Sequence, residues 1–280
     1  MKKSLIFSVI LLCIQFSFSQ EVAEDIYQQG LDSYNSKNFA AASGYFDEYI
    51  KMCPDSAKGY YSKGEVLLMT KEFENALDAF SEAILKDTTY LRAYSSRGVI
   101  YVLLNQTNNA FRDFRKALEI DPNDMITYNA MGIAYSQVGK MDDAISTLNT
   151  AISIDPSYSE SYRNRGLLYF YKGDTLKALT DLNKAIELNP SSVVLYNTRG
   201  GLYNVMGEYA KALDDFDRAL GIDGNNGEAY CRKGVAYLNL GIYDKAIEYM
   251  EKGVKLDPAM EDNIKDYLKE AKKKLSKKNK

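Results

Sequence analysis

The sequence predicts an all-α protein built from repeated helical hairpins. Its residues align at a period of 34 without insertion, and each unit contains two segments with apolar residues at helical spacing, separated by a turn. Two short helices cannot bury their apolar faces alone, so each unit needs its neighbours. The seven units cover residues 23–260 and start at Ala23, Ala57, Leu91, Met125, Ser159, Val193 and Gly227.

Residues 1–19 precede the repeats and differ from them. A pair of lysines is followed by a 12-residue apolar run, Leu5–Phe16, and then by small residues ending at Ser19. This order is typical of a secretory signal peptide, so we expect cleavage after Ser19 and a periplasmic or secreted protein. An uncleaved membrane anchor is disfavoured because the run is shorter than the roughly 20 residues that span a bilayer. A lipid anchor at Cys13 is disfavoured because Leu12, not a small residue, precedes it.

The composition favours a soluble globular protein without catalytic machinery. Hydrophobic residues make up 46% of the chain and charged residues 26%, and there is no His. The usual general base and a common metal ligand are therefore missing, and we expect no enzyme, no cofactor and no metal. The formal net charge of −3 gives no reason to expect nucleic acid as partner. Cys53 and Cys231 lie in the first and last repeats, too far apart in a stacked array for a disulfide.

A glycine column marks the first helix of every unit at its eighth position. Gly in a helix interior costs up to about 1 kcal/mol relative to Ala, so a close approach of the neighbouring helix backbone is expected to compensate. An alanine column at the twentieth position supplies a second small surface. The glycines are Gly30, Gly64, Gly98, Gly132, Gly166, Gly200 and Gly234, and the alanines are Ala42, Ala76, Ala110, Ala144, Ala178, Ala212 and Ala246.

The tyrosines and prolines also follow the repeat. Most units have Tyr at the fourth and eleventh positions, so the 23 tyrosines of the chain reflect architecture and do not by themselves indicate an aromatic binding site. Each of the five prolines lies at position 32, where it ends the second helix.

This set of Gly, Tyr, Ala and Pro columns at a 34-residue period resembles the tetratricopeptide repeat (TPR) family. The resemblance implies a right-handed superhelical solenoid of seven helical hairpins whose first helices line a concave groove. In that family the groove most often binds peptides or other proteins.

The turn after the first helix departs from the pattern in the first three units. It has Gly in the later units, Gly139, Gly173, Gly207 and Gly241, but Lys37, Lys71 and Asn105 in the first three. Because Lys is strained in the left-handed conformation that Gly favours, we expect the amino-terminal turns to differ in geometry.

A capping helix is predicted after the last repeat, over residues 261–275. Ile264, Leu268 and Leu275 fall on one helical face there. The residues that follow, 276–280, are predicted to be a basic tail, either solvated or attached to an anionic surface.

Position seven of the first helix is basic in five of the seven units. In three of them an Asp follows the Arg by 16 residues, in the second helix. We predict ion pairs that bridge the two helices of one unit, as opposed to a basic binding stripe. Repeat four has Met131 and Thr147 at these two positions, so it contains neither the Arg nor the Asp. The predicted pairs are Arg97 with Asp113, Arg165 with Asp181, and Arg199 with Asp215.

The resemblance assigns positions two, five, six, nine, twelve and thirteen of the first helices to the groove. Asn there can donate to and accept from a peptide backbone, and aromatic residues can form side-chain pockets. The candidates are Tyr27, Tyr34, Tyr61, Met69, Arg92, Asn129, Arg163, Asn164, Phe170, Tyr171, Asn197 and Arg232.

The expected function is a non-catalytic scaffold that binds a peptide or protein segment in this groove, in the cell envelope. Two alternatives stay open. One is a structural component of an envelope assembly that docks through its outer surface or basic tail. The other is a glycan-binding module.

Overall fold

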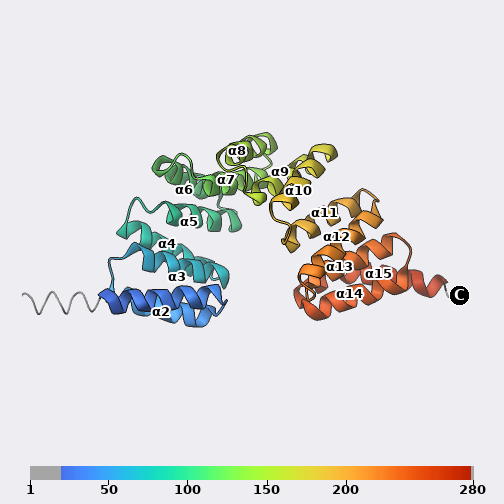
Figure 1. Cartoon of the computed structure of the whole chain (residues 1–280), viewed down its shortest axis with the longest axis horizontal. Coiled ribbons are helices and arrows are strands. Elements are labelled where there is room, and N and C mark those ends of the chain that lie inside the picture. Colours follow the sequence, from blue (N-terminus) through green and yellow to red (C-terminus); the bar gives the residue numbers. More distant parts are fainter. Residues whose placement is uncertain (1–19, 279–280) are drawn as a thin grey trace, which may run out of the picture. The chain divides into compact units, whose positions relative to one another are not determined.

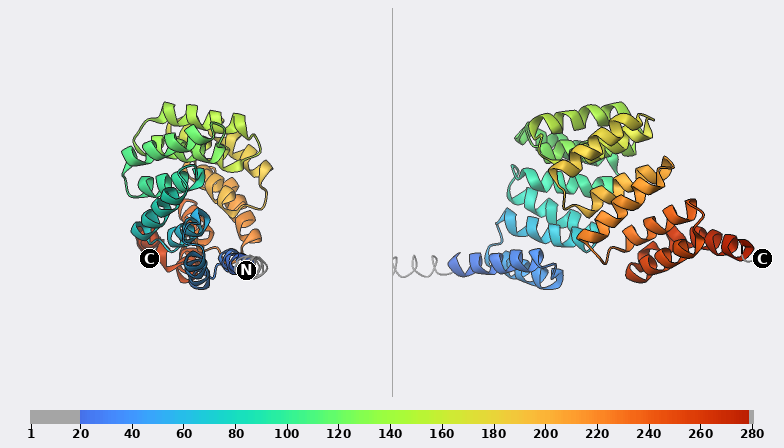
Figure 2. Two further views of the ribbon diagram at one scale, coloured as in Figure 1. Left: turned by 90° about the vertical axis from the view of Figure 1, so that its left-hand side faces the viewer. Right: turned by 45° about the vertical axis from the view of Figure 1, so that its right-hand side comes forward.

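The computed structural model describes residues 20–278, and this range contains helices and turns without a strand. The all-α fold predicted from the repeat is confirmed. Within each of the two compact units described next, successive helices pack side by side, as Figures 1 and 2 show. The predicted signal peptide, residues 1–19, lies outside the described residues.

The chain divides into two compact units, of which the first ends at Lys140 and the second begins at Met141. Unit 1 starts with residues 20–35, which are helical. Its other helices are α2 (Phe39–Met52), α3 (Ala57–Met69), α4 (Phe73–Lys86), α5 (Leu91–Leu103), α6 (Thr107–Ile120) and α7 (Met125–Gln137). Unit 2 contains α8 (Met141–Ile154), α9 (Ser159–Tyr171), α10 (Thr175–Leu188), α11 (Val193–Val205), α12 (Tyr209–Ile222), α13 (Gly227–Asn239), α14 (Tyr243–Leu256), η1 (Pro258–Met260) and α15 (Glu261–Lys278).

The first helices of repeats two to seven begin at the residues where the period places the start of each unit. Side-chain caps fix several of these ends. Asp124 accepts a hydrogen bond from the Thr127 backbone at the start of α7, and Asn226 accepts one from Ala229 at the start of α13. Such caps satisfy backbone N–H groups that the first turn of a helix leaves without a partner.

The glycine column accommodates a large side chain at position 24 of the repeat, which lies in the second helix. A Cβ on Gly98 would lie 2.5 Å from the Phe114 ring, and one on Gly234 would lie 2.5 Å from the Met250 side chain. The expectation of a backbone approach is therefore only partly right, because in most repeats a side chain fills the space. Backbone also lies close in two repeats: a Cβ on Gly166 would first meet the Ala178 carbonyl oxygen, at 3.1 Å, and one on Gly234 would lie 2.9 Å from the Ala246 carbonyl oxygen.

The turns between the two helices of each repeat share one backbone conformation. Lys37, Lys71 and Asn105 have φ values of 61°, 64° and 58°, in the same left-handed region as the glycines of the later turns. The predicted difference in geometry is wrong. The same pair of hydrogen bonds closes the turns at Lys71 and at Gly173, so the chain reversal imposes the conformation whichever residue occupies it.

Lys71→Gly is expected to raise the free energy of unfolding by about 1 kcal/mol, because Gly removes the steric cost of a Cβ at positive φ. The reciprocal change, Gly173→Lys, is expected to lower it by a similar amount. Urea unfolding followed by circular dichroism measures both. A Lys71→Gly protein less stable than the parent would contradict this account of the turn.

The capping helix is longer than predicted. α15 runs to Lys278, so the residues 276–278 assigned to a basic tail are helical. Ile264 and Ala271 on α15 are buried against Cys231, Leu238 and Met250 of the last repeat. The helix therefore covers an apolar surface that would otherwise end the array exposed. Within the described range, no helix has both the length and the apolar character needed to cross a membrane.

Candidate functional site

The first helices of neighbouring repeats contact each other within each unit. α3 contacts α5 and α5 contacts α7 in unit 1, and α11 contacts α13 in unit 2. We call the surface formed by positions two, five, six, nine, twelve and thirteen of these helices the first-helix face. Each unit carries its own part of this face, and the candidates are taken unit by unit.

In unit 1 the first-helix face holds a desolvated carboxylate, Glu65 at position nine of α3. Its Oε1 accepts a hydrogen bond of 2.9 Å from the Ser96 hydroxyl of α5. Burial raises the pKa of the Glu65 carboxyl, an effect opposed by hydrogen bonds from Ser96 and Tyr61 and by the charge of Arg92. Neither Glu65 nor Ser96 was among the predicted candidates, although both occupy groove positions.

Three of the predicted unit 1 candidates leave polar or apolar groups accessible. Arg92 is exposed and Met69 is 51% exposed. Tyr34 is half-buried, with its ring 5.8 Å from that of Phe39, and burial together with the charge of Glu65 raises its pKa. These side chains extend the polar cluster at Glu65 with apolar and cationic groups.

Tyr27 and Tyr61, both half-buried, make packing contacts as well, and their assignment to the groove stays a prediction. The Tyr61 ring lies 5.2 Å from that of Tyr90 and 5.6 Å from that of Phe80. Tyr27 packs in the same way against aromatic rings of α2, and its hydroxyl is 2.9 Å from that of Ser62. The rings at position five therefore pack within their own repeat, and the Tyr27 hydroxyl also reaches the next repeat at Ser62.

Asn129 and Asn197 also occupy position five but are buried, at 9% and 3% exposure. Asn197 donates a 3.2 Å hydrogen bond to Asn226, which caps α13. A side chain so enclosed offers little surface to a ligand. The prediction that these two residues bind a peptide backbone is therefore corrected: they pack inside the array.

In unit 2 the predicted candidates on α9 lie at the end of the helix and along its face. Arg163 donates a 3.1 Å hydrogen bond to Asn164 through Nη2, and both are half-buried. The rings of Phe170 and Tyr171 are 6.0 Å apart. Phe170 packs against the buried cluster around Leu182, whereas Tyr171 is 69% exposed. Tyr171 is thus the accessible aromatic group of this helix.

Arg232 lies at a pocket of about 310 Å³ formed by α11, α12, α13, η1 and α15. Its Nε and Nη2 both contact Glu228 Oε1, at 2.8 and 2.7 Å. Asn204 on the same pocket accepts a 3.2 Å hydrogen bond from Asn239. The contribution of α15 could not be predicted, because nothing in the repeat pattern places that helix beside the first-helix face.

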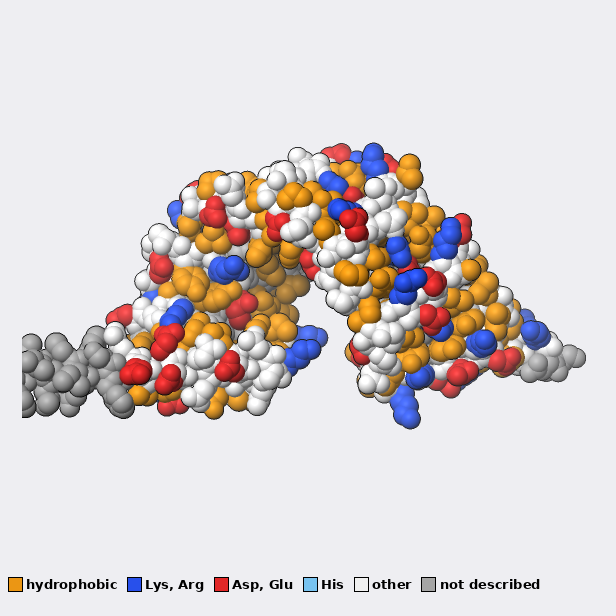
Figure 3. All heavy atoms as spheres, viewed as in Figure 1, with side chains coloured by type: hydrophobic (Ala, Val, Ile, Leu, Met, Phe, Trp, Pro, Cys, Tyr) orange, Lys and Arg blue, Asp and Glu red, His pale blue; other side chains and the backbone are white. Residues whose placement is uncertain are grey.

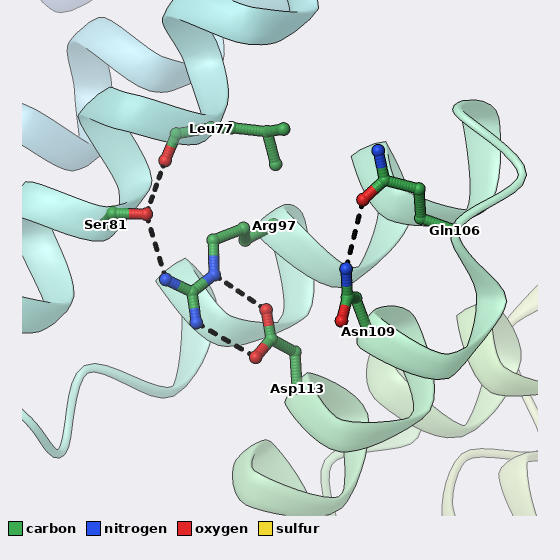
Figure 4. A network of polar contacts seen from close by, with 6 residues as sticks. All are labelled: Leu77, Ser81, Arg97, Gln106, Asn109 and Asp113. Atoms are coloured by element: carbon green, nitrogen blue, oxygen red, sulfur yellow. Dashed lines mark hydrogen bonds and ion pairs between the residues drawn. The ribbon is translucent and has the colours of Figure 1, made fainter.

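The structure brings together the three Arg–Asp pairs that the 16-residue spacing predicts. Arg97 donates through Nε and Nη2 to the two carboxylate oxygens of Asp113, at 2.7 and 2.9 Å (Figure 4). Arg165 and Arg199 make the same bidentate contact in repeats five and six. The aspartates are almost fully buried.

Each of these arginines also reaches the preceding repeat. The Nη1 atom of Arg97 donates to Ser81 at 2.9 Å, as Figure 4 shows, and Arg199 donates in the same way to Asn183. Both acceptors are at position 25. Where position seven is Lys, position 25 of the preceding repeat carries the carboxylate instead, as in Lys63 with Asp47 and Lys233 with Asp217. The Arg–Asp pairs stay within one repeat, and the second contact of the position-seven cation joins that repeat to the preceding one, which the spacing within one unit did not reveal.

Five family models described as tetratricopeptide or TPR repeats match the chain, and together they span residues 27–192 and 227–260. The chain belongs to the tetratricopeptide repeat family. No curated protein matches this TPR chain.

Solved structures resemble the TPR array over most of its length. A tetratricopeptide repeat protein from Parabacteroides merdae is 18% identical, with a TM-score of 0.69 and coverage of 90% of this chain and 99% of that one. Yeast Tom70 is 19% identical, with a TM-score of 0.71 and coverage of 93% and 55%. The Pseudomonas aeruginosa protein pilF is 20% identical, with a TM-score of 0.59 and coverage of 72% and 92%. At these identities the likeness shows the fold.

The TPR fold is a scaffold for protein interaction, and the position-seven cations serve its packing. The hydrogen bonds that Arg165 donates to Asp181 and Arg199 donates to Asp215 raise the pKa of the two guanidinium groups. A guanidinium held by a buried carboxylate and a second acceptor has little capacity left for a ligand. Acidic and basic side chains are interspersed on the face of each unit seen in Figure 3. The basic column is thus a set of structural contacts.

Within residues 20–278, no group of three acidic, Cys or His side chains is placed to hold a metal ion. Cys53 and Cys231, the cysteines within the described residues, are free, and burial raises the pKa of the Cys231 thiol to about 11, which keeps it protonated at neutral pH.

Proposed function

We propose that this protein is a non-catalytic, exported scaffold that binds a peptide or protein segment along its first-helix face, in the cell envelope. The pattern of residues 1–19 supports export, and the TPR fold supports protein interaction. The main support for peptide binding is the position of Glu65, a partly desolvated carboxylate that has no evident packing role but could bind a ligand.

Glu65 occupies a position that is not charged in the other six repeats. Position nine is otherwise Leu31, Val99, Ile133, Leu167, Gly201 and Val235. Desolvation of a carboxylate weakens the folded state unless its hydrogen bonds and charge are fully compensated. Glu65 is half-buried, and burial raises its pKa despite Ser96 and Arg92. Groups that reduce stability without a packing role are frequent at functional sites.

The chemistry of this cluster fits an extended peptide backbone. Glu65 has a second carboxylate oxygen that can accept from a peptide N–H or a cationic side chain, and the exposed Arg92 can donate to a peptide carbonyl. Met69 and Tyr34 offer apolar surface beside them. The Glu65 carboxylate is partly shielded from water in the free protein. A peptide that donates hydrogen bonds to it would therefore gain affinity, because these bonds replace few bonds to water.

A selection of random 12-residue peptides displayed on phage, made against the full chain, tests peptide binding. Glu65→Val is expected to weaken the selected peptides that contact unit 1 by at least about tenfold, as the loss of a charge-assisted hydrogen bond would. Val is the residue of the next repeat, Val99, so the variant suits the array. Glu74→Val, an exposed change on α4, is the matched control and is expected to leave binding unchanged.

Removal of the residues after Leu275 distinguishes this proposal from docking through the basic end of the chain. The shortened protein is expected to bind the selected peptides as the full chain does. Failure to select any binding peptide, or equal binding by the Glu65→Val protein and its parent, would overturn the proposed function.

Glu65→Gln is expected to change how stability depends on pH. The folded-state pKa of Glu65 is raised above the ordinary value of 4.5, so the folded protein binds the proton more tightly than the unfolded chain. The stability that this proton supplies is present below 4.5 and is lost as pH rises through the folded pKa. The variant should therefore gain stability over its parent between about pH 4.5 and 7. Urea unfolding across this range measures the difference, and a constant difference would contradict the desolvated state of Glu65.

Export is tested by cell fractionation and amino-terminal sequencing. The protein in the envelope or medium is expected to begin at Gln20, after removal of the segment that ends at Ser19. A cytoplasmic protein that still begins at Met1 would contradict export.

A further inference from the structure

The pocket at Arg232 is kept open by a glycine that the fold does not need. Gly200 at position eight belongs to the lattice, since its Cβ would meet Phe216 at 2.7 Å. Gly201, one residue later in α11, has no such contact, and its Cβ would meet only the Nη1 atom of Arg232, at 2.9 Å. A helix-interior glycine costs up to about 1 kcal/mol relative to Ala, and packing does not compensate for this one. An ordinary side chain there would extend into the space that the pocket occupies.

The lining of this pocket is largely apolar on one side. Val205, Val235, Met260 and Ile264 contribute side chains from α11, α13, η1 and α15. Val205 is 72% exposed, an unusual position for a large aliphatic residue at the end of a helix. The volume of about 310 Å³ is at the lower limit of small-molecule sites and suits one or two peptide side chains.

The charges at the pocket are paired within the protein. Arg232 uses Nε and Nη2 to contact Glu228, which leaves Nη1 toward Gly201 as its remaining donor group. An entering carboxylate would compete with Glu228, and an entering ammonium group would meet the guanidinium. Electrostatic complementarity therefore favours an uncharged occupant.

The capping helix supplies part of the polar rim. Asn263 and Tyr267 of α15 border the pocket together with Asn204 of α11. Amide and guanidinium groups around an apolar space can bind the N–H and C=O groups on either side of a peptide side chain. α15 is thus a wall of the site as well as the end of the array.

We propose that this pocket binds an uncharged aliphatic side chain, such as Leu, Ile or Met, of a peptide segment that lies along the first-helix face of unit 2. The inference rests on the proposed peptide binding and adds the chemistry of the partner. The aliphatic group fills the space beside Gly201, and Asn204, Asn263 and Arg232 Nη1 bind the adjacent peptide groups.

The test uses the peptides selected from the random 12-residue library against the full chain. Peptides that occupy unit 2 are expected to share one aliphatic position, and replacement of that residue by Asp or Lys is expected to weaken binding by at least about tenfold. Asn263→Trp, at an exposed position of the rim, and Gly201→Leu, at the floor, should each weaken the same peptides to a similar extent.

Asp266→Trp is the matched control, because Asp266 is exposed on the same helix but does not line the pocket. It is expected to change affinity by less than about twofold. If Gly201→Leu lowers the circular dichroism signal of the folded protein, the Asn263→Trp result decides alone. Peptides that bind with no aliphatic preference, or that bind the Asn263→Trp protein as tightly as the parent, would overturn this inference while peptide binding stands. If no peptide is selected, peptide binding fails and this inference fails with it.

Discussion

Replacement of Arg199 by Met is expected to lower the free energy of unfolding by about 3–5 kcal/mol, because the Asp215 carboxylate would stay buried without its partner. Asp215 is 1% exposed and accepts bonds of 2.9 and 2.6 Å from the Arg199 guanidinium. The contact from Arg199 to Asn183 of the preceding repeat would be lost as well. Urea unfolding followed by circular dichroism measures the change.

The natural sequence supplies the control for this prediction. Repeat four carries Met131 and Thr147 at the positions of Arg199 and Asp215. The double variant Arg199→Met with Asp215→Thr removes both charges together, so it is expected to recover most of the stability lost by Arg199→Met alone. A double variant as unstable as the single one would show that the cost does not come from the unpaired carboxylate.

Gly98→Ala is expected to destabilise unit 1 by about 1–3 kcal/mol, although Ala is the better helix former. The new Cβ would lie 2.5 Å from one atom of the Phe114 ring and 2.8 Å from another. Phe114 is fully buried, so the ring can move only by displacing its neighbours. The midpoint of urea unfolding is expected to fall accordingly.

Gly166→Ala is the matched substitution in repeat five, where position 24 is Leu182. Its nearest contacts would be 3.1 Å from the Ala178 carbonyl oxygen, 3.2 Å from Asp181 and 3.3 Å from Leu182. The gain in helix propensity, about 1 kcal/mol, is expected to offset much of this crowding. Gly98→Ala combined with Phe114→Leu should also recover stability. Equal effects of Gly98→Ala and Gly166→Ala would mean that the ring at position 24 does not determine the glycine column.

The turns and the polar column show where a repeat pattern fails to predict detail. Lys37 and Lys71 adopt the left-handed conformation because two backbone hydrogen bonds close each turn, which residue preference alone does not indicate. The Arg97 contact with Ser81 joins two different repeats. Spacing within one unit carries no information about such a contact until the stacking of neighbours is known.

The sequence by itself determined the helices, the period, the first-helix starts and the pairing of Arg97 with Asp113. These features follow from local hydrophobic periodicity and from residue types that recur at fixed spacing. The resemblance to the tetratricopeptide repeat family, in turn, assigned helical positions to the first-helix face. The sequence does not show which of those side chains pack inside the array, as Asn197 does.

Only the tertiary structure decided which groups of the first-helix face remain available. Glu65 is desolvated beside Ser96, and Gly201 leaves a pocket that α15 helps to enclose. The physical reason is that exposure depends on the size and direction of side chains from adjacent helices. Those neighbours are 31 residues away for Ser96 and Glu65, and they belong to a helix outside the repeat for the pocket.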